Sequence, residues 1–302
     1  MIVRDHLPFR RVWPHVSKRL GILFLFDLTI SLLYTKAGFT IVALPSLPLA
    51  MIGGALSIFL AFRNNSAYDR WWEARMLWGA LVNTSRTFAR QVLTLVEGST
   101  FNRESGDSRR SLIELQIAYV HALRCHLRRQ NPFPEFETIL DKEMICQLRE
   151  SKNIPLALLL RKGHLLRELF ESGKLDSYRF VAIDESLTEL CNIQGACERI
   201  KNTPLPRQYE YFPRVLVSVY CVLLPIGLVS GMGIMTPLAS TLVSFIFLSL
   251  ESIGKEIEAP FENSVHDTPM SSLSRTIEID LRQQLGDERL PASIRPVDGF
   301  VY

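Results

Sequence analysis

The chain alternates between long apolar runs and dense polar segments. Residues 20–34 are apolar except for Asp27, and extension of this run to Ala37 makes it long enough for one membrane span, since a helix needs about 20 residues to cross the hydrocarbon core. No charged residue occurs between Ala37 and Phe62. We place a second span at residues 44–62.

The longest uncharged run covers residues 215–250, which is too long for one span. Gly231, Gly233 and the pair Thr236-Pro237 divide it, and glycine and proline favour turns. The pattern therefore predicts a tight hairpin of two further spans. Four spans are an even number, so both termini lie on the same side of the membrane. The basic N-terminal arm indicates that this side is the cytoplasm.

Polar residues between Arg63 and Arg214 show helical periodicity. Residues that share one helix face recur every three or four positions, at Leu112, Leu115, Gln116, Tyr119, Ala122, Leu123 and His126. Residues 154–170 and 181–200 follow the same pattern, which is typical of amphipathic helices. We expect loops at 98–107 and 130–134 and an extended tail at 291–302. No strand-like alternation of useful length occurs, so the predicted fold class is all-α.

These runs divide the sequence into five predicted segments. The first is a basic cytosolic N-terminal arm, and a helical cytosolic domain separates two pairs of spans. A cytosolic C-terminal segment ends the chain. In order, the boundaries are 1–19, 20–63, 64–213, 214–254 and 255–302.

Composition limits the classes of function that the chain can have. The mean hydropathy of +0.13 and a 22% content of charged residues suit a few spans combined with a polar part of comparable size. A net charge of +3 gives no electrostatic case for nucleic acid. The five cysteines have no regular spacing, which argues against a disulfide framework. No phosphate loop, catalytic triad spacing or zinc-protease motif is present, so we expect neither an enzyme nor a cofactor.

The boundary after the second apolar run carries the most specific motif. Residues 62–75 read Phe-Arg-Asn-Asn-x-x-Tyr-x-Arg-Trp-Trp-Glu-Ala-Arg, and no glycine or proline occurs from Ala55 to Trp78. One helix can therefore continue from the membrane into water, with aromatic and basic residues at the interface. This motif, residues 195–206 and the acidic segment 256–261 together resemble the bestrophin family, in particular its bacterial branch.

The resemblance implies a homopentameric ion channel of the bacterial inner membrane, surrounded by lipid and passing small monovalent ions. Four spans and a helical cytosolic domain would form each subunit. The sequence shows no internal repeat, so a pore on a symmetry axis requires several chains. Gly54, Ile58 and Phe62 match the family's pore neck, although a bulky residue is usual at the position of Gly54. The alternative for Ile58 and Phe62 is ordinary packing between helices.

Charge on the same helix face gives a weak preference for cations. Ser66, Asp69 and Glu73 continue the face below Phe62 and could form acidic belts. Neighbouring arginines, Arg63, Arg70 and Arg75, could instead neutralise them. An anion channel of the same family and a non-conducting membrane scaffold or sensor therefore stay open as alternatives.

Other candidate positions follow from the resemblance or from residue type. Tyr178 matches a second constriction at the cytosolic exit, with a surface tyrosine as the alternative. Asp27 lies within a span and needs a function or a buried partner, for which Lys36 is a candidate. The acidic residues of the C-terminal segment lack the consecutive aspartates of the eukaryotic calcium site. A metal site at His121, Cys125 and His126 is conceivable, but packing is the simpler interpretation.

Overall fold

A computed structural model describes residues 9–43, 45–97, 107–296 and 300, and its regular structure is helical. The predicted arm up to residue 8, most of the predicted 98–107 loop, and residues 297–299 and 301–302 of the predicted tail lie outside the described residues. The chain divides into two compact units. Of the described residues, the apolar unit contains 9–71 and Pro204–Ala259, and the polar unit contains Trp72–Thr203 and the residues from Pro260 onward.

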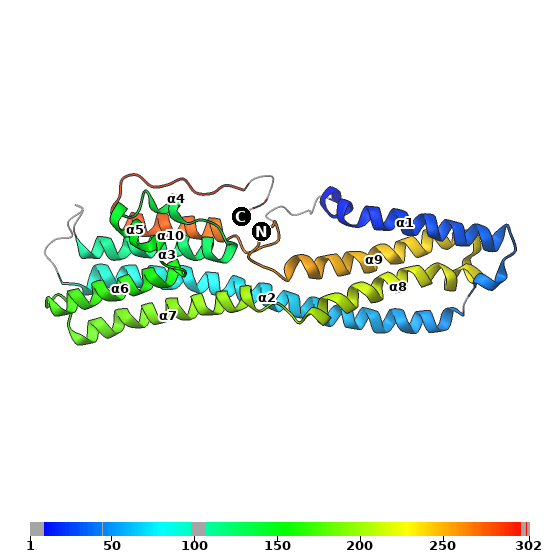
Figure 1. Cartoon of the computed structure of the whole chain (residues 1–302), viewed down its shortest axis with the longest axis horizontal. Helices are drawn as coiled ribbons and strands as arrows, with labels where there is room; N and C mark the ends of the chain where they lie inside the picture. Colours follow the sequence, from blue (N-terminus) through cyan, green and yellow to red (C-terminus); the bar gives the residue numbers. More distant parts are fainter. Residues whose placement is uncertain (1–8, 44, 98–106, 297–299, 301–302) are drawn as a thin grey trace. The chain divides into compact units, whose positions relative to one another are not determined.

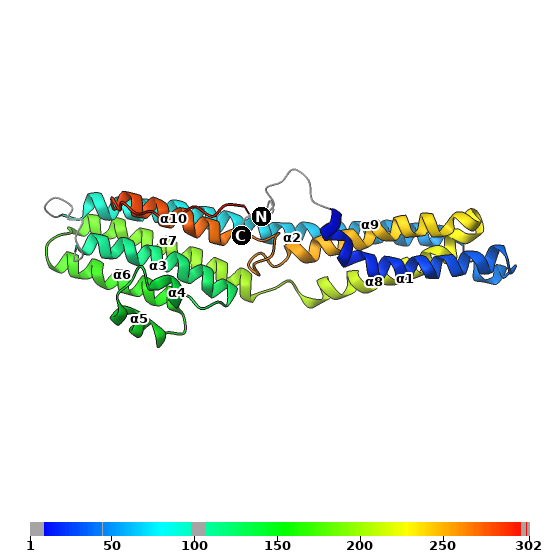
Figure 2. The same cartoon turned by 90° about the horizontal axis from the view of Figure 1, so that it is seen from above.

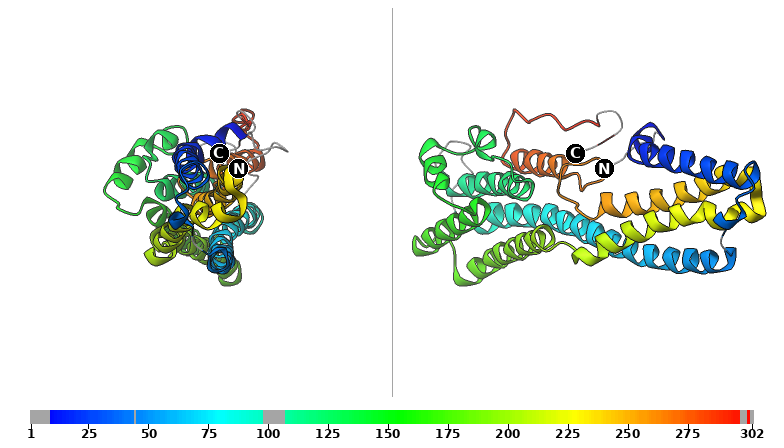
Figure 3. Two further views of the ribbon diagram at one scale, coloured as in Figure 1. Left: turned by 90° about the vertical axis from the view of Figure 1, so that its right-hand side faces the viewer. Right: turned by 45° about the vertical axis from the view of Figure 1, so that its right-hand side comes forward.

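The apolar unit is built from the uncharged runs. Helix α1 packs against both α8 and α9, which also pack against each other (Figure 1). A 3-10 turn, η2, joins α8 to α9 within the predicted hairpin (Figure 3). Gly233 in this turn has a φ of 50°, which suits glycine because it lacks a Cβ. The bounds are α1 Phe9–Thr35, η1 Thr40–Val42, α2 Ser46–Leu95, α8 Arg207–Met232, η2 Gly233–Met235 and α9 Thr236–Ile257.

Length and apolarity single out part of this unit. Among the described residues, the helical stretch Arg207–Ile257 is long and apolar enough to cross a membrane. This stretch contains α8, η2 and α9. Helix α2 continues without a break past Phe62 into the polar segment, because glycine and proline are absent from Ala55 to Trp78.

The polar unit surrounds helix α3. Fifteen residues of this helix are buried, and α6, α7 and α10 pack against it (Figure 2). The three segments with amphipathic periodicity are helices here, with α3, α6 and α7 extending a few residues beyond the predicted limits. The bounds are α3 Ser108–Arg128, α4 Phe133–Phe136, α5 Lys142–Arg149, α6 Ile154–Glu171, α7 Ser177–Asn202 and α10 Met270–Gln284.

Aspartate and asparagine side chains begin four of these helices. Asp107, Asp141, Asn153 and Asp176 each accept a hydrogen bond from a backbone N–H in the first turn of α3, α5, α6 and α7. Such caps satisfy amides that have no partner inside the helix. The sequence patterns did not predict α5 or α10, and the start of α4 falls within the predicted 130–134 loop.

A buried lysine lies in the core of the polar unit. Lys162 on α6 is fully buried and donates a hydrogen bond to Gln116 Oε1 on α3. Gln116 Nε2 in turn donates to Ser85 Oγ at 2.9 Å. Burial alone moves the pKa of Lys162 well below its ordinary value. This chain of polar groups joins α2, α3 and α6.

Candidate pore-lining site

One face of α2 exposes the predicted neck residues. Gly54, Ile58 and Phe62 lie one turn apart, and the side chains of Ile58 and Phe62 are 61% and 65% exposed. Leu56 and Leu60 are buried on the opposite face of the same helix. Large apolar side chains with so much exposed surface on one subunit are expected to face a neighbouring chain, a lipid or a pore.

Two adjacent glycines of α2 have different roles. A Cβ added at Gly53 would lie 2.5 Å from the hydroxyl oxygen of Tyr220 on α8, so this position must stay small for α8 to pack. A Cβ added at Gly54 would meet no atom within 4 Å. The absence of a side chain at Gly54 is therefore not required by packing inside the subunit.

The arginine and asparagine after Phe62 anchor α2 to the end of α9. Arg63 is 1% exposed and donates from Nη1 to the backbone oxygen of Glu251 at 3.2 Å. Its Nη2 lies 3.5 Å from Glu258 Oε2. Asn64 Nδ2 donates to the Leu250 oxygen at 3.1 Å. Arg63 is thus a buried structural residue, and the expectation that it could neutralise Asp69 or Glu73 is wrong.

Glu258 links the motif at residues 62–75 to the acidic segment at residues 256–261. Arg70 Nε donates to the Glu258 backbone oxygen at 3.1 Å. Burial raises the pKa of the Glu258 carboxyl, and the nearby Arg63 and Arg70 oppose that rise. Two of the three motifs that carried the resemblance therefore meet in one interhelical contact.

The three candidate selectivity residues differ in their surroundings. Ser66 is partly buried, and its Oγ donates to the Phe62 oxygen at 3.1 Å. Asp69 is exposed and has no ion pair among the described residues. Glu73 is half-exposed and forms an ion pair with Arg199 of α7. Glu73 is therefore neutralised, but by Arg199 rather than by the three arginines expected from the sequence.

Tyr178 lies in the first turn of α7 and is 90% exposed. Asp176 caps this turn by accepting from the Arg179 N–H at 2.9 Å. The cap fixes the start of the helix, while the phenol points into solvent and buries little surface against its own unit. Removing the ring would take little buried surface from this subunit.

Asp27 is buried on α1 and lies 3.4 Å from Thr241 Oγ1 on α9. The candidate partner Lys36 is exposed and forms no ion pair with it within the described ranges. Asp27 is therefore held by a hydroxyl of the neighbouring helix instead of by a lysine.

The residues considered for metals have other partners. His121 Nε2 lies 3.0 Å from Glu278 Oε2, and His126 Nε2 lies 3.4 Å from Glu198 Oε1. No group of three or more histidine, cysteine or acidic side chains suited to a metal occurs in the described part of the chain. Three of the C-terminal acidic residues are paired with basic side chains: Glu251 with Arg19, Glu258 with Arg63 and Glu262 with Lys201.

Burial of Glu278 alone would raise its pKa, but the hydrogen bonds from His121 and Arg282 and the charge of Arg275 lower it to about 2. This carboxylate on α10 therefore stays ionised beside His121 of α3. The sequence reading missed this cluster because α10 itself was missed. Glu278 and Arg282 are spaced as i and i+4, which is the signal that could have indicated a helix there.

An all-helical subunit with an apolar unit, a helical polar unit and an exposed apolar face on one long helix is the fold of a bestrophin-like channel subunit. The chain belongs to the bacterial and fungal bestrophin family, whose profile, described as "Bacterial/Fungal Bestrophin protein", matches residues 9–283.

Named relatives and a solved structure agree. The chain is 35% identical over 298 residues to a voltage-dependent anion channel-forming protein of Ralstonia nicotianae, covering 96% of each chain. It is 34% identical to the voltage-dependent anion channel-forming protein YneE of Escherichia coli K12, covering 98% of each. The crystal structure of a bacterial bestrophin homologue from Klebsiella pneumoniae superimposes with a TM-score of 0.84 and 30% identity, covering 91% of this chain and all of that one.

Proposed function

We propose that the protein is a homopentameric channel for small monovalent ions, with its neck at Gly54, Ile58 and Phe62. The observation that carries this proposal is the exposed face of α2, where two large apolar side chains one turn apart are each more than half exposed. In a ring of subunits, one copy of this face from each chain surrounds the axis.

An apolar ring acts on ions through their hydration. Water and ions lose solvation between apolar side chains, so a narrow ring empties and blocks conduction until it widens. Ile58 and Phe62 supply such a ring. Gly54 leaves the adjoining level wider, because it has no side chain and open space beside it.

The proposed channel lies in the inner membrane with both termini in the cytoplasm. The apolar unit spans the bilayer in contact with lipid through four helices, and residues 64–213 form most of the cytosolic domain. Tyr178, which is almost fully exposed on α7, would form a second constriction at the cytosolic exit.

The sign of the permeant ion depends on charges below the neck. Asp69 is the exposed carboxylate available to favour cations, whereas Glu73 is held by Arg199. The names of the Ralstonia and Escherichia relatives favour anions instead. One exposed carboxylate in each subunit favours cations less strongly than two acidic belts would, and an anion channel is the second candidate.

Two measurements test the proposal. Mass photometry of the detergent-purified protein should give a particle of about 170 kDa above its detergent, five times the 34.4 kDa subunit. Ion flux from liposomes should rise in Ile58→Ala and Phe62→Ala, because truncation widens the ring. Leu242→Ala is the matched control, since Leu242 is a 60% exposed apolar residue on α9.

A stable monomer or dimer would exclude the pentamer. Assembled variants that conduct like the parent would assign Ile58 and Phe62 to packing, and absence of flux from every assembled form would support a scaffold or sensor. For the ion, the double change Asp69→Asn, Glu73→Gln should move the reversal potential toward anions, most strongly at low salt where screening is weak. An unchanged potential would remove the acidic belt.

A further inference from the structure

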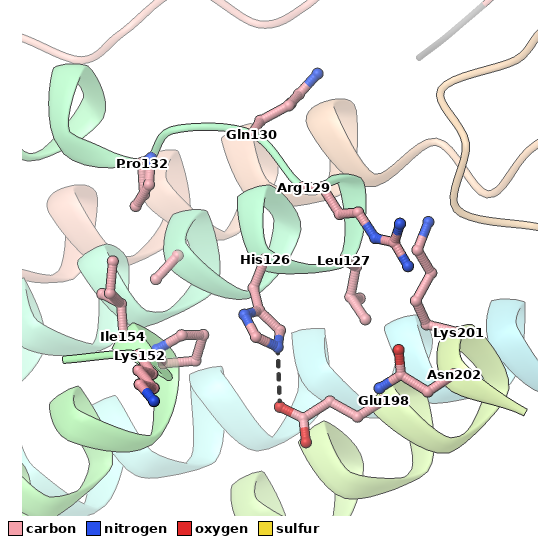
Figure 4. A pocket seen from close by; sticks show the side chains of 12 residues that line it. His126, Leu127, Arg129, Gln130, Pro132, Lys152, Ile154, Glu198, Lys201 and Asn202 are labelled. Atoms are coloured by element: carbon pink, nitrogen blue, oxygen red, sulfur yellow. Dashed lines mark ion pairs between the residues drawn. The ribbon is translucent and has the colours of Figure 1, made fainter.

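A pocket in the polar unit has dispersed charges. It has a volume of about 360 Å³ and lies between α3, α6 and α7. Arg129 and Lys152 lie at opposite ends of it, and Glu198 lies between them with its Oε1 3.4 Å from His126 Nε2 (Figure 4). One small anion there cannot contact both cations.

A smaller pocket of about 200 Å³ in the apolar unit differs, because its basic residues come from three helices that pack together, α1, α8 and α9. The lining consists of apolar Val16 and Leu248, polar Ser252, acidic Glu251, and basic Arg19, Arg214 and Lys255. The two apolar side chains are buried and form a floor, whereas the three basic residues are exposed. None of the residues proposed for conduction lines this pocket.

The three basic residues lie at a similar depth along their helices. The other ends of α1, α8 and α9 meet at η2. Each basic residue is about 24–29 Å from that end of its helix, at the helical rise of about 1.5 Å per residue. Apart from Asp27 and Glu251, these stretches carry no charged residue. A hydrocarbon core of about 30 Å therefore places the pocket at the level of the cytosolic headgroups in the proposed orientation.

Two long ion pairs leave positive charge in this pocket. Glu251 is buried, and its Oε2 lies 3.8 Å from Arg19 Nη1. Lys255 Nζ lies 3.9 Å from Oε1 of Glu210, an α8 residue outside the lining. Hydrogen bonds need about 2.7–3.2 Å between such atoms, so both cations keep donors available. Arg214 has no ion pair or side-chain hydrogen bond among the described residues.

Helix spacing brings Arg214 and Lys255 within reach of one ligand. Glu210 and Arg214 are one turn apart on α8, and side chains at this spacing are neighbours with their Cβ atoms about 5–6 Å apart. The Lys255 amine approaches Glu210 from α9. Arg214 therefore begins one turn from the point that the Lys255 amine reaches, and both long side chains can turn toward the same group. Ser252 Oγ already donates to Glu256 Oε1, outside the lining, at 3.3 Å.

We propose that this pocket binds the headgroup of an anionic phospholipid of the inner leaflet, an inference that rests on the inner-membrane placement of the proposed function. Arg214 and Lys255 would hold the phosphodiester, since guanidinium and ammonium groups form strong charge-assisted hydrogen bonds with phosphate oxygens. Basic pockets between membrane helices on the cytoplasmic side suit such headgroups. Ile22, one turn from Arg19 toward the bilayer, and Val215 are exposed and give the acyl chains an apolar surface. A choline headgroup would instead add a cation beside three others.

Native mass spectrometry of the detergent-purified full chain tests this site with phosphatidylglycerol and with phosphatidylcholine of the same acyl chains. Phosphatidylglycerol should bind about tenfold more tightly. Arg214→Gln and Lys255→Gln should each weaken its binding about tenfold, which is the loss expected for one charged hydrogen bond, and leave phosphatidylcholine unaffected. Both side chains are exposed, so the variants should fold, and an unchanged melting temperature verifies this.

Lys18→Gln is the matched control, because Lys18 is an exposed lysine next to Arg19 on α1 and outside the lining. It removes one charge at the same depth and should leave the lipid preference unaltered. Equal binding of the two lipids would overturn the proposal, as would an equal loss of affinity in the control. Displacement of phosphatidylglycerol by inorganic phosphate would make free phosphate the ligand and overturn the lipid. Binding is read without ion flux, so a parent that binds phosphatidylglycerol but does not conduct would contradict only the channel, and a conducting parent without lipid preference only the lipid site.

Discussion

Lys162 offers a quantitative test of the polar unit because its side chain is fully buried without an acidic partner. No salt bridge to Lys162 occurs within the part of the chain that the structure describes. Its Nζ lies 4.4 Å from the ring centroid of Tyr119 and 5.2 Å from that of Phe88. Replacement by methionine, Lys162→Met, removes the amine and keeps a flexible side chain of similar length.

Two opposing terms decide the charge of the buried amine. Attraction to a desolvated aromatic ring contributes about 2 kcal/mol to the ammonium form. Removal of an ion from water costs several kcal/mol even after the protein relaxes. Desolvation exceeds the aromatic attraction, and the pKa of Lys162 accordingly lies well below its ordinary value.

This shift predicts how stability depends on pH. Between the native pKa and the unfolded pKa of about 10.4, the unfolded chain binds a proton that the native chain does not. The unfolding free energy of the parent should therefore fall as pH falls through this range, by up to about 1.4 kcal/mol per pH unit. Lys162→Met should lack this slope. At neutral pH, two effects on the unfolding free energy of Lys162→Met oppose each other. Loss of the buried amine stabilises the variant by about 1–4 kcal/mol. Gln116 Oε1, left without its donor, destabilises it by about 1–3 kcal/mol.

A second substitution separates these two contributions. Gln116→Leu removes the acceptor, and Ser85 stays satisfied because its hydroxyl donates to the Leu81 oxygen at 2.7 Å. The double variant should therefore be about 1–3 kcal/mol more stable than Lys162→Met alone, and Gln116→Leu alone should be destabilised. The resulting interaction energy should exceed the few tenths of a kcal/mol found for independent sites.

Hydrogen exchange of the amides in α3 and α6 in the full-length protein, read by mass spectrometry from pH 7 to 10, measures the opening free energy of this core. Only the difference between parent and variant is interpreted, so other titrating groups cancel. Parallel pH profiles would show that Lys162 is charged in the native state and refute the desolvation argument. Additive effects of the two substitutions would refute the role of Gln116 as its acceptor.

Three further predictions use thermal or flux measurements. Glu278→Gln should lower the unfolding free energy at neutral pH by up to about 3 kcal/mol, because the pKa of this carboxyl is lowered to about 2 in the folded state. The ionised carboxylate stabilises the folded state above its unfolded pKa, and this contribution is lost as pH falls toward 2. Acid unfolding profiles that match the parent would contradict this. Gly53→Ala should destabilise the apolar unit through a clash with Tyr220, whereas Gly54→Ala should have the melting temperature of the parent and change only ion flux. Equal melting temperatures for the two variants would contradict the packing role of Gly53. Tyr178→Ala should change stability by less than about 0.5 kcal/mol while altering conductance or selectivity; loss of assembly with unchanged conductance would make it an interface residue.

The sequence was sufficient for features that depend on one helix at a time. Uncharged runs and apolar stripes predicted helices at α1, α3, α6, α7, α8 and α9. The absence of glycine and proline predicted that α2 continues past Phe62. The shared face of Ile58 and Phe62 also follows from their spacing of four residues, because side chains one turn apart share a face of a helix, whereas the exposure of that face is known only from the structure.

Periodicity failed where the pattern was short or polar. Helix α10 contains few apolar residues, and its buried stripe comprises Ile277 and Leu281 with Met270 at its start. Its main polar contact is made by Glu278 with His121, far earlier in the chain. The apolar pattern of this segment is too short to predict a buried helix by itself, and the burial of its stripe depends on packing against α3.

Tertiary structure alone decided which residues meet. Arg63 and Arg70 look like interfacial charges in the sequence, yet Arg63 is buried against the end of α9, and the partner of Glu73 is Arg199. Gly53 and Gly54 are equivalent in sequence, but only Gly53 faces Tyr220. A helical pattern shows which side chains share a face, whereas the group opposite that face comes from a residue more than a hundred positions away. Its identity depends on how the helices pack.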